Sequence, residues 1–106
     1  MTRTAAWEIE KASRRGWARL IVSGDLDLST ALTFRRQVRA LKAAATGVCL
    51  DLSQLQFIDC AGLHALNDVL AESRQGGWSV EIAPGVSVQA RRFLDLLAAA
   101  GVPSEL

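Results

Sequence analysis

Hydrophobic and polar positions follow two different periods along this 106-residue chain. A period of two marks its beginning, where Trp7 and Ile9 alternate with two glutamates, and this pattern predicts a half-buried strand. A turn is expected at 13–16. The following run, residues 17–24, is apolar on both faces from Ala18 to Val22 and predicts a second strand that lies deeper and forms a hairpin with the first.

Three later segments have helical spacing, because their apolar residues recur in steps of three and four. The first helix is expected to begin within 27–30 and to end at 46–47. The second runs from 62 to the glycine pair 76–77, and the third follows the turn at 84–85 and stops at 101. The predicted core stripes are Ala31, Phe34, Val38 and Leu41, then Leu63, Leu66 and Leu70, then Val86, Ala90, Phe93, Leu94 and Leu97.

Two further strands complete the pattern. The segment 48–59, "VCLDLSQLQFID", opens as a central strand, and alternation at Trp78, Val80 and Ile82 predicts another. The order β-β-α-β-α-β-α implies an α/β fold, with a small mixed sheet whose first strand is antiparallel and whose other strands are parallel. The helices are expected mainly on one face, and 1–106 is interpreted as one domain. The last residues are open between a short strand and a frayed end.

Composition narrows the function classes. Twelve basic and eleven acidic residues leave a net charge of +1, which disfavours direct nucleic-acid binding. No long apolar run predicts membrane insertion, and the beginning of the chain has no signal-like pattern, so a cytoplasmic location is expected. There Cys49 and Cys60 are expected as reduced thiols, and one histidine with two cysteines predicts neither a metal site nor a cofactor.

The candidate chemistry lies in two loops, "GDLDLST" at 24–30 and "FIDCAG" at 57–62, which we expect at one rim of the sheet. Asp27 and Asp59 each precede a helix, and helix capping is the simplest role for both, with Ser29 and Thr30 as further caps of the first helix. Cys60 is either a small packed residue or a thiolate favoured by the helix end but opposed by Asp59. His64 stands one turn further along the same helix, so a thiol enzyme is conceivable on spacing alone, but no oxyanion donors are evident and an enzyme is not expected.

Together, "GDLDLSTA" and "VCLDLSQLQFIDCAGLHAL" resemble the STAS domain of anti-sigma factor antagonists, over about residues 7–97. The resemblance implies an anti-anti-sigma factor that binds an anti-sigma factor of the histidine-kinase-like ATPase type and thereby releases a sigma factor. In that family a phosphorylated serine or threonine follows the second acid. Here Cys60 occupies this position, so the resemblance implies no phosphate control there, and neither Ser29 nor Ser53 matches the position.

Other interpretations stay open: a STAS subunit of a lipid-transport ABC ATPase, whose counterparts share the look of "DCAG", or a redox sensor that uses Cys60. Oligomeric state is open as well. The basic side of the first helix is interpreted as a solvated surface, with an acidic partner as the alternative. The residues expected to bind the partner are Asp27, Asp59, Cys60, Ala61, Gly62, His64, Asn67 and Asp68.

Overall fold

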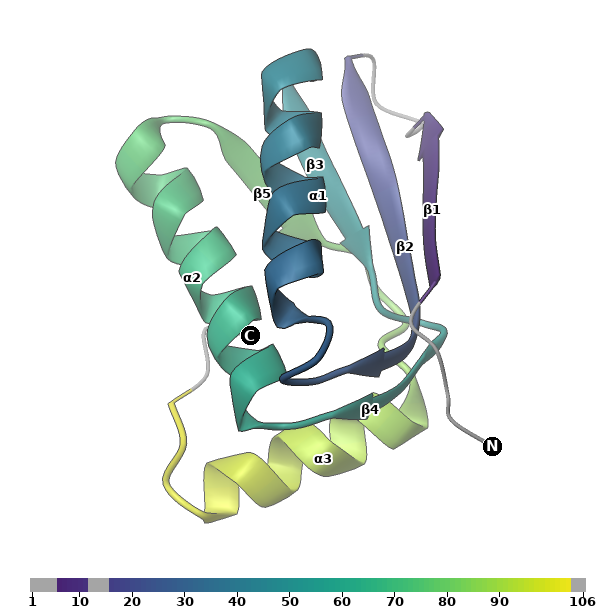
Figure 1. The fold of residues 1–106 in the computed structure, drawn as a ribbon, viewed down its shortest axis with the longest axis vertical. Helices are drawn as coiled ribbons and strands as arrows, with labels where there is room; N and C mark the ends of the chain where they lie inside the picture. The colour runs from purple at the N-terminus through teal and green to yellow at the C-terminus, as the bar shows by residue number, and fades with distance from the viewer. Residues whose placement is uncertain (1–5, 12–15, 104–106) are drawn as a thin grey trace.

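The protein is described by a computed structural model that covers residues 6–11 and 16–103. Within these ranges the chain forms a mixed sheet and three helices (Figure 1). The strands are β1 (Ala6–Lys11), β2 (Trp17–Leu26), β3 (Gly47–Asp51), β4 (Leu55–Ile58) and β5 (Ser79–Ile82), and the helices are α1 (Ala31–Ala44), α2 (Cys60–Gly76) and α3 (Val88–Ala99). No helix in the described part of the chain is long and apolar enough to cross a membrane.

The sheet has the order β1-β2-β3-β5, and β4 pairs with β2 as well. β1 is antiparallel to β2, whereas β2–β3, β2–β4 and β3–β5 are all parallel pairs. This confirms the predicted mixed sheet with one antiparallel strand. It also gives the strand order, which the hydrophobic pattern alone does not determine.

The segment 48–59 was predicted to contain a single strand at its beginning, but it contains two strands, so the predicted element order was wrong at this point. β3 ends at Asp51, and a turn closed by a hydrogen bond from Leu55 N to Leu52 O (3.2 Å) separates it from β4. β3 pairs with the first half of β2, through Ile21, and β4 pairs with its last residues, from Gly24. The long strand β2 therefore takes two successive parallel partners, which a pattern of buried residues does not distinguish from one.

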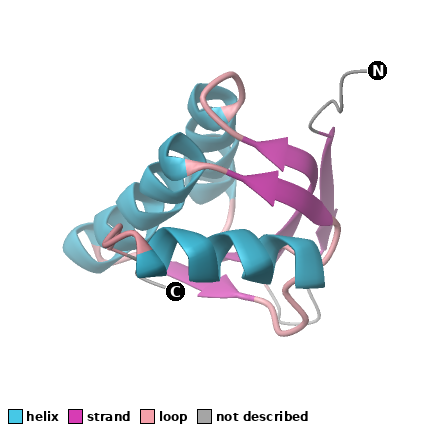
Figure 2. Cartoon of the chain, turned by 90° about the horizontal axis from the view of Figure 1, so that it is seen from below, coloured by secondary structure: helices cyan, strands magenta, loops and turns pink. Residues whose placement is uncertain are grey.

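Helices α1 and α2 lie side by side over one face of the sheet, while α3 packs against β4 at one end (Figures 1 and 2). The core between sheet and helices contains Leu20, Phe34, Leu50 and Leu66, none of which has any exposed surface. Each belongs to a run or stripe that the sequence predicts as buried. Burying a leucine or phenylalanine side chain contributes about 1.5–3 kcal/mol, so this shared core is what holds the helix layer on the sheet.

Several boundaries and one face differ from the prediction. α1 stops at Ala44, because Thr46 N leaves the helix and donates to Gly16 O (2.7 Å). α2 begins at Cys60, and α3 begins at Val88, after the residue expected to start its stripe. Ile9 was expected to be half-buried, but it is 56% exposed on the edge strand β1, whereas Trp7 on the same strand packs against Phe34 of α1.

Two expectations fall partly outside the described residues. Of the turn at 13–16, only Gly16 is described, with a positive φ of 81°. Residues 102 and 103 belong to no strand, and 104–106 lie outside the described ranges.

Candidate partner-binding site

The two acidic loops meet at the ends of two neighbouring parallel strands. β2 and β4 pair side by side, and each leads through a short loop into a helix (Figure 2). Asp59 N donates to Leu26 O (3.3 Å), and Leu28 N donates to Asp59 Oδ2 (3.3 Å). The expectation that both loops share one rim is therefore confirmed.

Asp59 also performs the capping role that its position predicts. Its Oδ1 atom accepts a hydrogen bond from Gly62 N (2.8 Å), which satisfies one of the free N–H groups in the first turn of α2. Its two carboxylate oxygens thus serve different elements, one the start of α2 and the other the loop before α1. This single side chain ties the two loops together.

Gly62 lies where the first turn of α2 crosses the end of β2. A Cβ atom at this position would lie 2.0 Å from Leu26 O and 3.0 Å from Ile58 Cγ1. The first of these is a backbone atom, which cannot rotate away. Gly62 is buried, so it shapes the rim from beneath rather than by touching a partner.

Asp27 does not cap α1, contrary to the expectation. Its Oδ1 atom accepts from Ser29 N (2.9 Å) and from Ser29 Oγ (2.6 Å), which closes a local turn. Hydrogen bonding from the Ser29 side chain lowers the pKa of Asp27, so this carboxyl is charged at neutral pH. The N-cap residue of α1 is Thr30, and its hydroxyl makes no capping bond because it accepts from Asp27 N (2.9 Å) and donates to Asp25 O (2.9 Å).

Cys60 and His64 are both exposed on the first turns of α2. Neither side chain makes a hydrogen bond or ion pair with the residues that the structure describes, so no thiol–imidazole pair is formed. Within the part of the chain that the structure describes, neither Cys49 nor Cys60 forms a disulfide. No group of His, Cys, Asp and Glu among the described residues is arranged to hold a metal ion.

Beyond its first two turns, α2 has outer residues that contact α1 and Pro103. Asp68 pairs with Arg35 (2.6 Å) and Glu72 with Arg39 (2.9 Å), so the basic side of α1 is partly paired within the protein rather than wholly solvated. Hydrogen bonding from Arg39 lowers the pKa of Glu72. Asn67, also expected at the site, donates from Nδ2 to Pro103 O (2.9 Å). Of the expected residues, Asn67 and Asp68 lie farther along α2 than the two loops.

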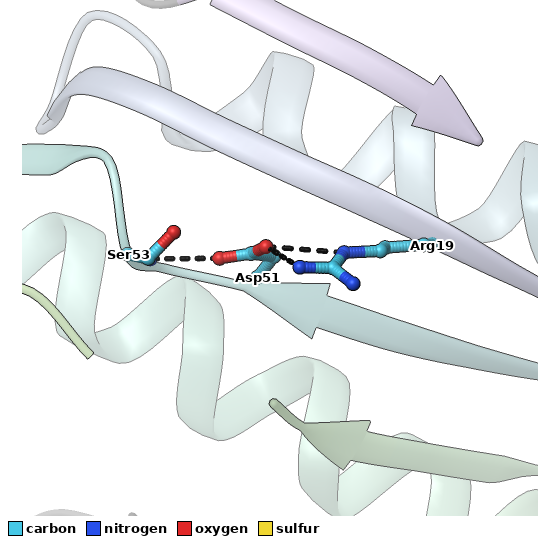
Figure 3. A network of polar contacts seen from close by, with 3 residues as sticks. All are labelled: Arg19, Asp51 and Ser53. Carbon is cyan, nitrogen blue, oxygen red and sulfur yellow. Dashed lines mark hydrogen bonds and ion pairs between the residues drawn. The ribbon is translucent and has the colours of Figure 1, made fainter. Parts of the chain in front are cut away.

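Asp51, the acid of "LDLS", lies away from the rim, buried on the sheet (Figure 3). Its Oδ2 atom accepts from both Nε (3.1 Å) and the terminal nitrogen of Arg19 on β2, and its Oδ1 atom accepts from Ser53 N (2.9 Å). Burial raises the pKa of Asp51, but hydrogen bonding from Ser53 and from Arg19 outweighs it and holds this pKa below its ordinary value. The role of this acid is to join β2 and β3.

Comparison with known families gives a direct result. A family model described as "Mlab, STAS domain" matches residues 10–104, most of the chain. The chain belongs to the STAS domain family. No curated protein sequence matches it.

Solved structures confirm the STAS fold. An anti-sigma factor antagonist from Mycobacterium paratuberculosis is 22% identical with a TM-score of 0.65, over 92% of this chain and 81% of that one. The unphosphorylated form of the anti-sigma factor antagonist SpoIIAA, a cell fate determinant of Bacillus, is 17% identical with a TM-score of 0.59, over 92% and 84%. A sulfate transporter family protein from Wolinella succinogenes is 18% identical with a TM-score of 0.63, over 87% and 72%.

Sequence reasoning missed two apolar residues at the rim of this STAS domain. Leu28, in the loop before α1, is 80% exposed, and Leu32, in the first turn of α1, is 54% exposed. The sequence did contain a signal for Leu28, which follows two acids and precedes two hydroxyl residues in "GDLDLST". A loop of this kind shows no hydrophobic periodicity that would place Leu28 in the core. The hydrogen bond from Leu28 N to Asp59 Oδ2 places Leu28 beside the Asp59 loop.

Proposed function

We propose that this STAS domain is an anti-anti-sigma factor in the cytoplasm, which binds an anti-sigma factor of the histidine-kinase-like ATPase type. The loops at Asp27 and Asp59, together with the exposed start of α2 at Cys60 and His64, form the contact surface. This binding sequesters the ATPase and releases its sigma factor. The observation that carries the proposal is the Asp59 carboxylate, which holds both loops in one fixed surface.

Rigid loops favour protein binding. A surface whose loops are already hydrogen-bonded to one another loses little conformational entropy when a partner docks. The acids of the rim suit a partner surface with lysine or arginine residues, and charge complementarity of this kind gives both specificity and a faster encounter. No enzymatic step is required, which agrees with the exposed and unpaired state of Cys60 and His64 described above.

Phosphate control through this surface is absent in the proposal. A phosphate group carries about −1.5 to −2 charges and would be placed between Asp27 and Asp59, where it would repel a partner fitted to the uncharged form. Cys60 has no hydroxyl to accept it. The domain is therefore proposed to stay permanently in its binding-competent form.

The identity of the bound ATPase tests this function. Tagged protein is expressed in its native cell and its partners are identified by mass spectrometry, with an Asp59→Ala variant as the control because it lacks the carboxylate that joins the loops. We expect an ATPase with a histidine-kinase-like fold with the wild type and much less of it with the variant. Recovery of no such ATPase would reject the proposal.

A STAS subunit of a lipid-transport ABC ATPase is the second candidate. The sequence "DCAG", residues 59–62, favours it, because the counterparts of such subunits share an Asp-x-Ala-Gly pattern. It predicts the same contact surface and a different partner. Recovery of an ABC ATPase in the experiment above would favour this candidate over the first.

A further inference from the structure

Exposed large apolar side chains are few in this protein. Among the described residues, those at least half exposed are Ile9, Leu28, Leu32, Val88 and Leu96. Two of them, Leu28 and Leu32, lie four residues apart at the entry to α1, and Leu28 is the most exposed of the set at 80%. Exposed apolar residues that gather at one place mark interaction sites more often than residues scattered singly.

The ion pairs between α1 and α2 show where these leucines lie relative to α2. Arg35–Asp68 and Arg39–Glu72 both join residues 33 positions apart, so the two helices run in the same direction with constant register. Leu32 stands three residues before Arg35, on the same side of α1. One turn before the first ion pair, this register brings Leu32 level with His64 and its buried neighbour Ala65.

Leu28 precedes α1, so this register does not extend to it, but the hydrogen bond from Leu28 N to Asp59 Oδ2 places its backbone beside the loop that leads into α2. Two ion pairs therefore join the helices further along, and the two exposed leucines stand just before α1 and in its first turn, near the loop that ends at Asp59.

Leu28 is also held in place. Its backbone N–H is bonded to Asp59, and the next residues form a turn closed by Asp27 Oδ1 with Ser29 N (2.9 Å) and by Asp27 O with Ala31 N (2.8 Å). An exposed leucine in a fixed turn loses less conformational freedom on binding than one in a free loop. This is the arrangement expected of a binding anchor.

We infer that Leu28 and Leu32 are the apolar anchors of this surface, and that they insert into an apolar recess of the partner ATPase bordered by lysine or arginine residues. The inference rests on the proposed function and adds the chemistry of the partner's contact site. The basic border follows from charge complementarity, because Asp27 directly precedes Leu28 and Asp59 accepts a hydrogen bond from its N–H group. Leucines supply the buried area, and the two acids orient the partner.

Binding measurements with leucine-to-serine variants test the anchors. The dissociation constant of the complex with the recovered ATPase is measured for wild type, Leu28→Ser, the double variant Leu28→Ser/Leu32→Ser, and Leu96→Ser. Leu96 is the matched control because it is 59% exposed on α3. We expect about tenfold weaker binding for Leu28→Ser, about 100-fold for the double variant, and no change for Leu96→Ser.

Circular dichroism and thermal unfolding of each variant confirm that it folds. Equal binding by all variants would reject the anchors and leave the proposed function intact. If Leu96→Ser weakened binding to the ATPase as much as Leu28→Ser, the anchors would also be rejected. Loss of any exposed leucine would then weaken binding, wherever it lies on the surface.

A crosslinking experiment distinguishes failure of the leucine anchors from failure of the proposed function. A photoreactive benzoylphenylalanine is placed at position 28, 64 or 96 of the full chain in the native cell. Crosslinks to the histidine-kinase-like ATPase from 28 and 64 but not from 96 are expected. A crosslink from 64 alone would reject Leu28 as an anchor, whereas no crosslink to that ATPase from either 28 or 64 would reject the proposed function and the anchors with it.

Discussion

At the scale of single residues, Gly62 and Asp59 show how closely two elements approach at the rim. Gly62 has no Cβ atom, and a Cβ atom there would collide with Leu26 O. The Asp59 carboxylate accepts hydrogen bonds from Leu28 N in one loop and from Gly62 N at the start of α2. The sequence "DCAG", residues 59–62, shows that both residues lie at the start of a helix, and the capping role of Asp59 follows from this position. The crowding at Gly62 does not follow, because it depends on where the end of β2 lies.

Gly62→Ala tests this crowding. In an open helix this change stabilises, since alanine has the better helix propensity by about 0.8–1 kcal/mol. Here the contact with Leu26 O reverses the sign, and we expect a loss of about 1–3 kcal/mol in the free energy of unfolding, measured by urea denaturation.

Gly85→Ala is the matched control, because its Cβ would meet open space while its φ of 90° alone disfavours alanine. Its expected loss, about 1–2 kcal/mol, comes from backbone strain without any contact. If Gly62→Ala were as stable as the wild type or more stable, the close approach of α2 to β2 would be wrong.

At the scale of elements, charged pairs join neighbours in two different environments. Arg35–Asp68 and Arg39–Glu72 lie at the surface between α1 and α2, where each such pair contributes about 0.2–1 kcal/mol. Arg19–Asp51 joins β2 to β3 with the acid buried, and loss of one partner there leaves an unpaired buried charge. The buried pair therefore has the larger consequence for folding.

Acidification tests the Asp51 network. The folded-state pKa of Asp51 is lowered from its ordinary value of 3.8, so the unfolded chain takes up the proton first as the pH falls. The stabilisation is present above about pH 5 and is lost as the pH falls through 3.8 to the folded pKa. We expect Asp51→Asn to be less stable by about 1.5–3 kcal/mol at pH 7 and to have a shallower loss of stability with acid, as measured by denaturation between pH 7 and 3.

Asp27 and Glu72 also have lowered pKa values, so some acid dependence remains in the Asp51→Asn variant. Arg19→Met is the complementary variant. It leaves the Asp51 carboxylate buried without its cation, and its deficit is expected to be larger at pH 7 than at pH 3, where the carboxyl is protonated. A deficit that does not change with pH would show that Arg19 acts through packing alone.

At the scale of the whole molecule, the fold brings two loops from distant parts of the chain to one surface beside two parallel helices. Any group added at residue 60 would stand at the start of α2, with Asp59 before it and the Asp27 loop beside it. The charge at this one position is therefore expected to control docking. Cys60 is exposed, so access by another protein is not the obstacle to modification.

Phosphorylation tests this control. With the recovered ATPase and ATP, intact mass measurement is expected to show no added phosphoryl group on wild type or on Cys60→Ala, and one on Cys60→Ser. The serine variant, once phosphorylated, is expected to lose binding to the ATPase because of repulsion from Asp27 and Asp59. A phosphoryl group on the wild type would overturn the claim that the switch is absent.

The sequence by itself determined the element types, most of the core stripes and the mixed sheet, because the periods of two and of three to four report which face each segment buries. Leu70 is the exception among the predicted core residues of α2, since it is only half-buried and lies outside the core cluster. Phe34 and Leu66 are fully buried as their stripes predict. The pairing of both loops at one rim also followed, since parallel strands end at the same edge.

Only the tertiary structure decided which partner each strand takes, and therefore that 48–59 is two strands. It decided as well that Asp51 is a buried tie to Arg19 and that Leu28 and Leu32 stand exposed beside α2. The physical reason is common to all of these. A residue's own segment sets its local conformation, whereas its burial, its charge partner and its neighbours across the surface depend on segments that lie far away in the chain.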